Sequence, residues 1–221
     1  MSIFEFSRLL GQLSPVFLIL GVLLGMLLYK RLNAIHKSII YYFLAMLCVD
    51  LTGRFLAQYG NNHVVLIVYS LVEVMGVGYF YYKFLLSKRY VPIFIVNILA
   101  ILYISWELFS YLFFKTDVKY FQPYAKVVDN FVVILLALTF LYEKMNDFKE
   151  SRWDNFKLNI VVLVFFTLNT LIFLPFNFLV NESTGIKFYF WMGNLLIVLL
   201  FYGFLINEVW KNGRQSKLTP Q

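Results

Sequence analysis

The sequence predicts an all-α fold, a polytopic membrane protein with seven transmembrane helices, and three observations carry this prediction. The 221 residues are 61% hydrophobic, only 14% are charged, and long apolar stretches recur along the chain. A soluble domain carries about 45–50% apolar and about 25% charged residues, so this chain lacks the charges to cover a soluble core. The 25 phenylalanines and 16 tyrosines exclude disorder, and the single cysteine excludes a disulfide scaffold.

Seven stretches are long enough to cross a bilayer as helices, because a crossing takes roughly 20 mostly apolar residues. In chain order they are Leu9–Tyr29, Ser38–Gln58, Val64–Phe84, Val91–Phe114, Pro123–Tyr142, Lys157–Val180 and Ile186–Trp210. They are too long for membrane strands and show no alternation of period two. The first stretch has no small-residue cleavage site after it, so we expect a span and not a signal peptide. The connections are short, and residues 1–221 are therefore expected to form a single seven-helix domain.

The basic residues predict the orientation, because lysine and arginine accumulate on the cytoplasmic side of a membrane protein. Thirteen of them fall at one side of the seven spans: Lys30, Arg31, Lys37, Lys83, Lys88, Arg89, Lys144, Lys149, Arg152, Lys157, Lys211, Arg214 and Lys217. Five fall at the other side: Arg8, Lys115, Lys119, Lys126 and Lys187. This bias predicts the amino terminus outside and the carboxy terminus in the cytoplasm. It also accounts for the net charge of +7 without nucleic-acid binding, since no basic stretch is long enough to follow a phosphate backbone.

Polar residues inside the spans are the candidate ligand-binding residues, because they are costly in a bilayer and usually face the bundle interior or a wet cavity. From the second span to the seventh they are Asp50 and Arg54; Tyr69 and Glu73; Tyr103 and Glu107; Asp129 and Asn130; Asn169; and Asn194. At a rise of about 1.5 Å per residue, the charged and amide groups among them lie roughly 6–16 Å from the outer helix ends. The outer half is therefore expected to hold a shared polar cavity, above an apolar and sealed inner half.

Spacing along each helix adds detail to this cavity. Asp50 and Arg54 are four residues apart, so an ion pair within the helix is feasible. Four acids face one deep base, Arg54, with Lys126 nearer the surface, so the cavity is open to water, contains protonated acids or holds a cation. Glu107 and Asp129 are the weakest members, since both could extend to the outer surface.

Several kinds of site chemistry are excluded or weak. The last span has no lysine midway, as rhodopsin-type retinal chemistry requires, and neither of the two histidines lies at depth for a zinc site. We expect no metal or cofactor, and an enzyme is less favoured than a binding protein. A shift of 121 residues places Glu73 on Asn194 and Tyr81 on Tyr202, so spans one to three match five to seven. This three-one-three plan resembles the SWEET and PQ-loop transporters in its arrangement of parallel repeats, although the Pro-Gln pair is absent from the spans.

The function predicted from these patterns is that of a sensory or ligand-binding module, with an outward-facing intramembrane pocket for a small polar or cationic ligand. The short tail places any signalling output in a separate cytoplasmic partner. Three alternatives stay open: a small-solute transporter with the three-one-three plan, an intramembrane lipid-modifying enzyme using Asp50 and Glu73, and an accessory subunit that contacts another membrane protein. The expected location is a plasma or inner membrane, with the lipid bilayer as the first partner.

Overall fold

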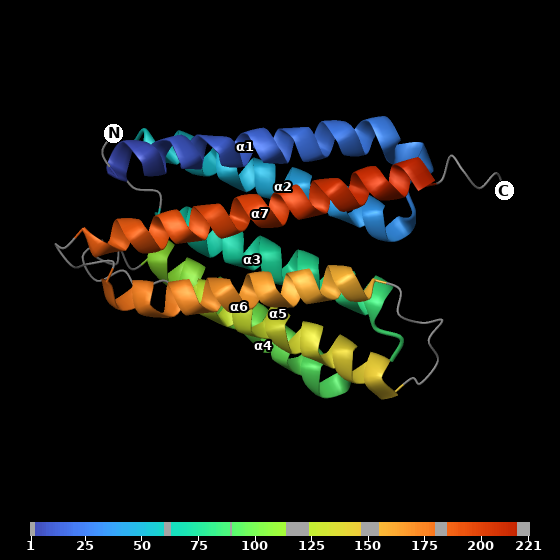
Figure 1. The fold of residues 1–221 in the computed structure, drawn as a ribbon. Helices are drawn as coiled ribbons and strands as arrows, with labels where there is room; N and C mark the ends of the chain where they lie inside the picture. Colours follow the sequence, from blue (N-terminus) through green and yellow to red (C-terminus); the bar gives the residue numbers. More distant parts are fainter. Residues whose placement is uncertain are drawn as a thin grey trace.

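Seven long helices account for most of the chain (Figure 1). The computed structural model describes residues 3–59, 63–88, 90–113, 124–146, 155–179 and 185–215. The helices are α1 (Ile3–Leu28), α2 (Ala34–Ala57), α3 (His63–Phe80), α4 (Val91–Phe113), α5 (Tyr124–Asn146), α6 (Phe156–Leu179) and α7 (Ile186–Gln215). A 3-10 turn, η1 (Tyr29–Arg31), follows α1, and a π-helical turn, η2 (Tyr81–Leu85), follows α3. The described residues contain no strand.

All seven predicted spans are confirmed as helices that are long and apolar enough to cross a membrane. The largest differences are at the ends of the bundle, where α1 begins at Ile3 instead of Leu9 and α7 ends at Gln215 instead of Trp210. The predicted bounds follow hydropathy, whereas the backbone continues its hydrogen bonding beyond the apolar stretch, so such differences are expected. The chain is accordingly a multi-pass, all-helical membrane protein.

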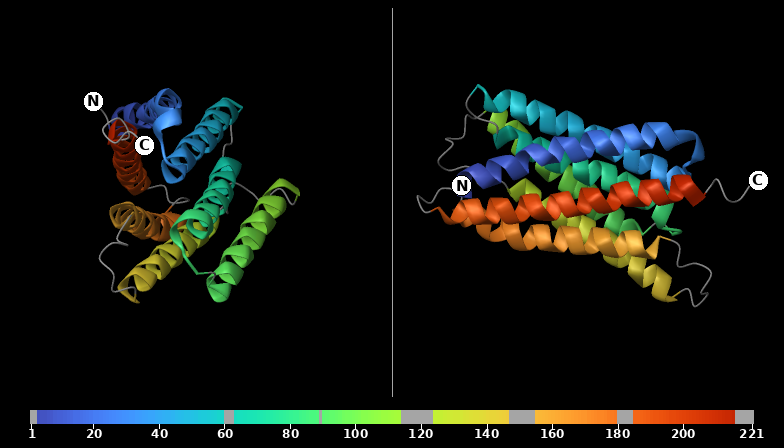
Figure 2. Two further views of the ribbon diagram at one scale, coloured as in Figure 1. Left: turned by 90° about the vertical axis from the view of Figure 1, so that its right-hand side faces the viewer. Right: turned by 45° about the horizontal axis from the view of Figure 1, so that its top comes forward.

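The helices other than α4 pack in a ring, and α4 lies outside it against α3 and α5, as the view along the bundle shows (Figure 2). The first helix, α1, packs against α2 and, most extensively, against α7, which closes the ring. Further round, α3 packs against α2, α4 and α5, and α6 lies between α5 and α7. α4 sits at the edge, where 17% of its spanning window is buried, against 56% for α5. The interior of the bundle is therefore built mainly by helices other than α4.

Two glycines allow α1 to approach α2 and α7 closely. A Cβ atom on Gly25 would lie 2.5 Å from Cγ1 of Ile40 on α2, and one on Gly213 of α7 would lie 2.7 Å from Cδ1 of Leu28. Small residues at helix interfaces let backbones approach, which matters in lipid because no hydrophobic driving force brings the helices together. These two glycines fix α1 against α2 and α7.

Candidate functional site

A buried ion cluster lies inside the bundle, and Lys126 of α5 is its centre. The Lys126 ammonium contacts Oε2 of Glu73 on α3 and lies 2.7 Å from Oδ2 of Asp129, one turn along α5. The side chains are 3%, 0% and 0% exposed. One cation therefore faces two carboxyl groups, and the cluster has a formal charge of −1 when both are ionised.

Aromatic side chains from three further helices enclose this cluster. Tyr42 of α2 donates a hydrogen bond of 2.8 Å from its hydroxyl to Oε1 of Glu73. The Lys126 ammonium lies 5.1 Å from the ring centre of Tyr69 and 5.7 Å from that of Phe166 on α6, within cation–π range. The hydroxyl of Tyr69 is 2.9 Å from that of Tyr202 on α7.

The cluster thus joins α2, α3, α5, α6 and α7 through polar and cation–π contacts. Charges in the hydrocarbon region almost always face the bundle interior or a water-filled cavity and pair with one another. Removing one partner of such a pair leaves an uncompensated buried charge, which costs far more than the intact pair contributes. The surrounding helices must therefore keep the Lys126 ammonium in contact with both carboxyl groups.

Two of the residues predicted for the site form a separate ion pair on α2. Nε of Arg54 lies 2.7 Å from Oδ2 of Asp50, and its Nη2 donates to the carbonyl oxygen of Gly11 on α1 at 2.5 Å. The side chains of Arg54 and Asp50 are 39% and 21% exposed. The ion pair that the spacing suggested is present, and it ties α2 to α1 outside the buried cluster.

The residues predicted on α4 are also apart from the cluster. Tyr103 is exposed, whereas Glu107 is half-buried and lies beside Tyr103 and the backbone of Ala125 on α5. The Glu107 carboxylate oxygens are buried, so this side chain does not extend to the outer surface. Nor does Asp129, which is 0% exposed. Burial between helices overrides the tendency of a charged side chain to reach the interface.

Three predicted asparagines are buried on the helices that surround the cluster: Asn130 on α5, Asn169 on α6 and Asn194 on α7. Each has a side-chain carbonyl oxygen without a hydrogen-bond partner in the part of the chain that the structure describes. Of the ten predicted residues, the structure brings Tyr69, Glu73 and Asp129 together, with Asn130 next in the chain.

Lys126 is the main residue that the prediction missed, because it was counted among the cations nearer the outer surface. Its side chain is 3% exposed. The spacing of three residues to Asp129 on the same helix was the signal that could have found it. Tyr42, Phe166 and Tyr202 carry no comparable signal, since aromatic residues are frequent throughout the spans.

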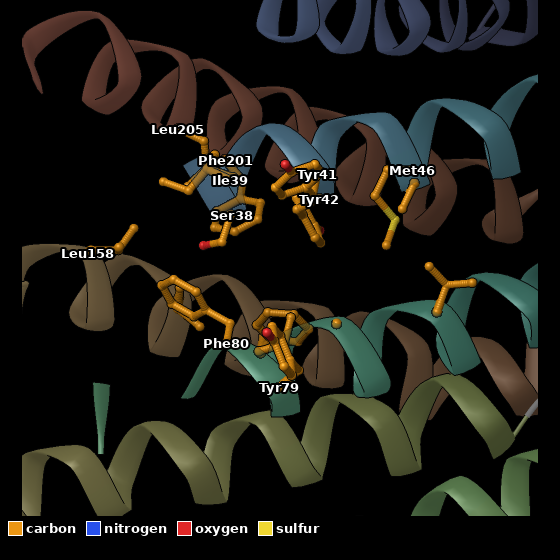
Figure 3. Close-up of a pocket in the computed structure, with 16 residues that line it drawn as sticks. Ser38, Ile39, Tyr41, Tyr42, Met46, Tyr79, Phe80, Leu158, Phe201 and Leu205 are labelled. Atoms are coloured by element: carbon orange, nitrogen blue, oxygen red, sulfur yellow. The ribbon is translucent and has the colours of Figure 1, made fainter. Parts of the chain in front are cut away.

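A pocket lies beside the cluster, between α2 on one side and α3 and α6 on the other, with α7 behind (Figure 3). Its volume is about 290 Å³. Its lining is formed by Ser38, Ile39, Tyr41, Tyr42, Ala45, Met46, Val72, Gly76, Val77, Tyr79, Phe80, Leu158, Val162, Phe166, Phe201 and Leu205. None of the ten predicted site residues lines it, and apolar and aromatic side chains dominate the wall.

The pocket occupies the half of the bundle nearer the basic helix ends, which the apolar sequence of that half predicted to be sealed. Its residues come from the first half of α2 and the second half of α3, whereas Asp50 and Arg54 lie toward the other end. Hydropathy along the sequence cannot show such a space, because the space results from how side chains of four helices meet. Tyr42 and Phe166 belong both to the pocket wall and to the surroundings of Glu73 and Lys126.

Among the described residues, no group of three or more histidine, cysteine, aspartate or glutamate side chains is placed to hold a metal ion. Comparisons of the chain with protein-family models, with curated proteins and with solved structures find no match.

Proposed function

We propose that this chain is a ligand-binding membrane protein of the sensory type, with its ligand in the pocket between α2, α3, α6 and α7. The observation that carries the proposal is the double role of Tyr42. Its ring lines the pocket, and its hydroxyl bonds to Glu73 in the buried cluster. A ligand that displaces this ring changes a contact of the cluster.

Through the cluster, a displacement of the Tyr42 ring can change contacts with other helices of the bundle. Five helices meet there, and two of the aromatic side chains around it, Tyr42 and Phe166, also line the pocket. A ligand shifts the equilibrium between two conformations of a protein when it binds one of them more tightly. Here the two conformations would differ in the position of the pocket-wall residues, which contact the ligand directly. A cytoplasmic partner at the basic end of the bundle would receive the signal.

The chemistry of the pocket favours a ligand with an apolar body and one polar group. The charged residues first expected to bind a small polar or cationic ligand are engaged with each other, Asp50 with Arg54 and both Glu73 and Asp129 with Lys126. The pocket instead offers mainly apolar side chains. Its serine and tyrosine hydroxyls are bonded within the protein, but each oxygen has a further lone pair that can accept a hydrogen bond from a ligand. A cationic group remains compatible with the site, because tyrosine ring faces attract cations.

Gly76 provides the sharpest test of ligand binding in this pocket. It lines the pocket, and a Cβ atom built on it would meet nothing within 4 Å. The variant Gly76→Trp should therefore fill the space without displacing a packed neighbour. Met75→Trp is the matched control, because Met75 is the preceding residue and is 51% exposed on the outside of the bundle.

The experiment measures thermal unfolding of the protein in nanodiscs with 1-decanol, decylamine or decanoic acid, which share one tail and differ in head group. We expect at least one of the three to raise the unfolding temperature of wild type and Met75→Trp, and to leave Gly76→Trp unchanged. An equal shift in all three proteins, or no shift in wild type, would contradict the proposal. The head group that acts best reports the charge that the site prefers.

A further inference from the structure

The pocket opens toward the bilayer between α2 and α3. Tyr41 and Tyr79 line it, and these two side chains are 58% and 57% exposed. In a helix bundle embedded in a membrane, exposed side chains along a span face lipid. A molecule can therefore enter this pocket sideways from the hydrocarbon region, without crossing the aqueous phase.

Two lysines at the basic end of the bundle lie close to the exposed tyrosines of this opening. Lys37 precedes Ser38 of the pocket wall, and its ammonium lies 5.0 Å from the ring centre of Tyr29, whose hydroxyl is 2.8 Å from that of Tyr41. On the facing helix, Lys83 donates from Nζ to the Tyr79 hydroxyl at 2.5 Å.

A third lysine lies on α6, at the same end of the pocket. Lys157 precedes Leu158 of the lining, is 66% exposed, and pairs with Glu208 at 3.6 Å. The pocket thus has an apolar interior, and Lys37 and Lys83 lie close to its exposed tyrosines without lining it, with the partly compensated Lys157 nearby. We call Lys37 and Lys83 the positive rim.

The charge of the lipid head group determines which lipid such a pocket prefers inside a membrane. An apolar pocket facing lipid gains little from burying apolar surface, since lipid tails are as apolar as its own side chains. Basic residues near an anionic membrane surface each contribute about 1 kcal/mol of attraction, equivalent to about fivefold in affinity. Selectivity must therefore come from the rim.

We propose that the ligand is an anionic phospholipid of the leaflet at the basic end, which the sequence predicts to be cytoplasmic. One acyl chain occupies the pocket through the opening between Tyr41 and Tyr79, and the phosphate is bound by Lys37 and Lys83. This inference rests on the proposed function, and it adds the class of ligand and its route of entry.

The test is native mass spectrometry of the purified protein in a mild detergent. The protein receives equal amounts of phosphatidylglycerol and phosphatidylcholine with the same acyl chains, and glycerol 3-phosphate in a separate sample. We expect one tightly bound phosphatidylglycerol on wild type, little phosphatidylcholine, and no retained glycerol 3-phosphate. Lys37→Gln/Lys83→Gln should bind phosphatidylglycerol about 25-fold more weakly, at about fivefold for each lysine.

Two matched controls keep the result specific to this site. Lys211→Gln removes an exposed lysine near the end of α7 that, unlike Lys37 and Lys83, is neither next to a lining residue in the chain nor bonded to one, and it should bind phosphatidylglycerol like wild type. Gly76→Trp should lose the bound lipid, whereas Met75→Trp should keep it. The proposal is overturned if Gly76→Trp binds like wild type, if the double lysine variant and Lys211→Gln behave alike, or if glycerol 3-phosphate alone binds equally well.

The failure of this inference can be told apart from failure of the proposed function. If 1-decanol or decylamine stabilises wild type but not Gly76→Trp, and phosphatidylglycerol shows no preference over phosphatidylcholine, then the pocket binds a ligand and only the lipid assignment is wrong. If Gly76→Trp changes neither measurement while it folds as stably as Met75→Trp, both proposals are wrong.

Discussion

The Tyr42 hydroxyl on α2 donates a hydrogen bond of 2.8 Å to Oε1 of Glu73 on α3. This bond joins the wall of the pocket to the buried ion cluster, because the Tyr42 ring lines the pocket and the other oxygen of Glu73 contacts Lys126. The bond links α2 to α3 at the point where side chains of α5, α6 and α7 also meet. We expect the stability of the bundle to depend on it, and under the proposed function the response to a ligand as well.

Replacing Tyr42 by phenylalanine tests the strength of this bond. The ring stays in the pocket wall, while the Glu73 carboxylate loses a donor, and hydrogen bonds to charged groups contribute about 1.5–3 kcal/mol. We expect Tyr42→Phe to lower the free energy of unfolding in mixed micelles by this amount. Tyr41→Phe is the control, since it removes a hydroxyl whose bond to Tyr29 lies at the exposed surface, and it should change stability little. A Tyr42→Phe protein as stable as the control would show that the bond is unimportant.

The ion cluster should respond asymmetrically to the loss of its charges. Lys126→Met leaves two buried carboxyl groups without a cation, and breaking a buried pair in this way costs about 3–5 kcal/mol. Asp129→Asn leaves a balanced pair, Lys126 with Glu73, and should cost much less. Denaturation in mixed micelles compares the two variants.

A triple variant distinguishes charge balance from packing. Lys126→Met combined with Glu73→Gln and Asp129→Asn removes all three charges, so it should recover much of the stability that Lys126→Met loses. If the triple variant is no more stable than Lys126→Met alone, the uncompensated carboxyl charges are not what destabilises Lys126→Met, and the charge argument is wrong.

The sequence predicted the number and the approximate limits of the helices because these depend on local composition. A run of about 20 apolar residues must be helical in lipid to satisfy its backbone hydrogen bonds. The bounds of α4 show this, predicted as Val91–Phe114 and found as Val91–Phe113. The ion pair of Asp50 with Arg54 was also predictable, because both residues lie on one helix four positions apart.

Contacts between helices were not predictable in the same way. The position of Lys126, near the start of its span, suggested a surface cation, yet packing of α3 and α6 against α5 buries it. Depth from the helix end placed Glu107 and Asp129 in the outer half but did not tell which face of the bundle each one occupies. The pocket depends on four helices together, and so no single span carries a sign of it.

The close contact of α1 with α2 can be tested at glycine positions. In Gly25→Ala the new methyl group meets the stiff, β-branched side chain of Ile40 at 2.5 Å, so we expect a loss of about 1–3 kcal/mol from overpacking. Gly76→Ala is the matched control, because its methyl group has free space. Alanine also favours the helix over glycine. Equal effects of the two substitutions on unfolding would contradict the close approach of the two helices.

The orientation of the bundle remains a prediction from the basic residues, and cysteine labelling can test it. The only cysteine, Cys48, is first replaced by serine. Tyr59→Cys then places a thiol just after α2, at a side chain that is 74% exposed, and Lys211→Cys places one near the end of α7, at the opposite end of the bundle. A membrane-impermeant maleimide applied to intact cells should label Tyr59→Cys and should label Lys211→Cys only after permeabilisation. The reverse labelling pattern would place the basic helix ends outside the cell and contradict the orientation predicted from the excess of lysine and arginine in cytoplasmic loops.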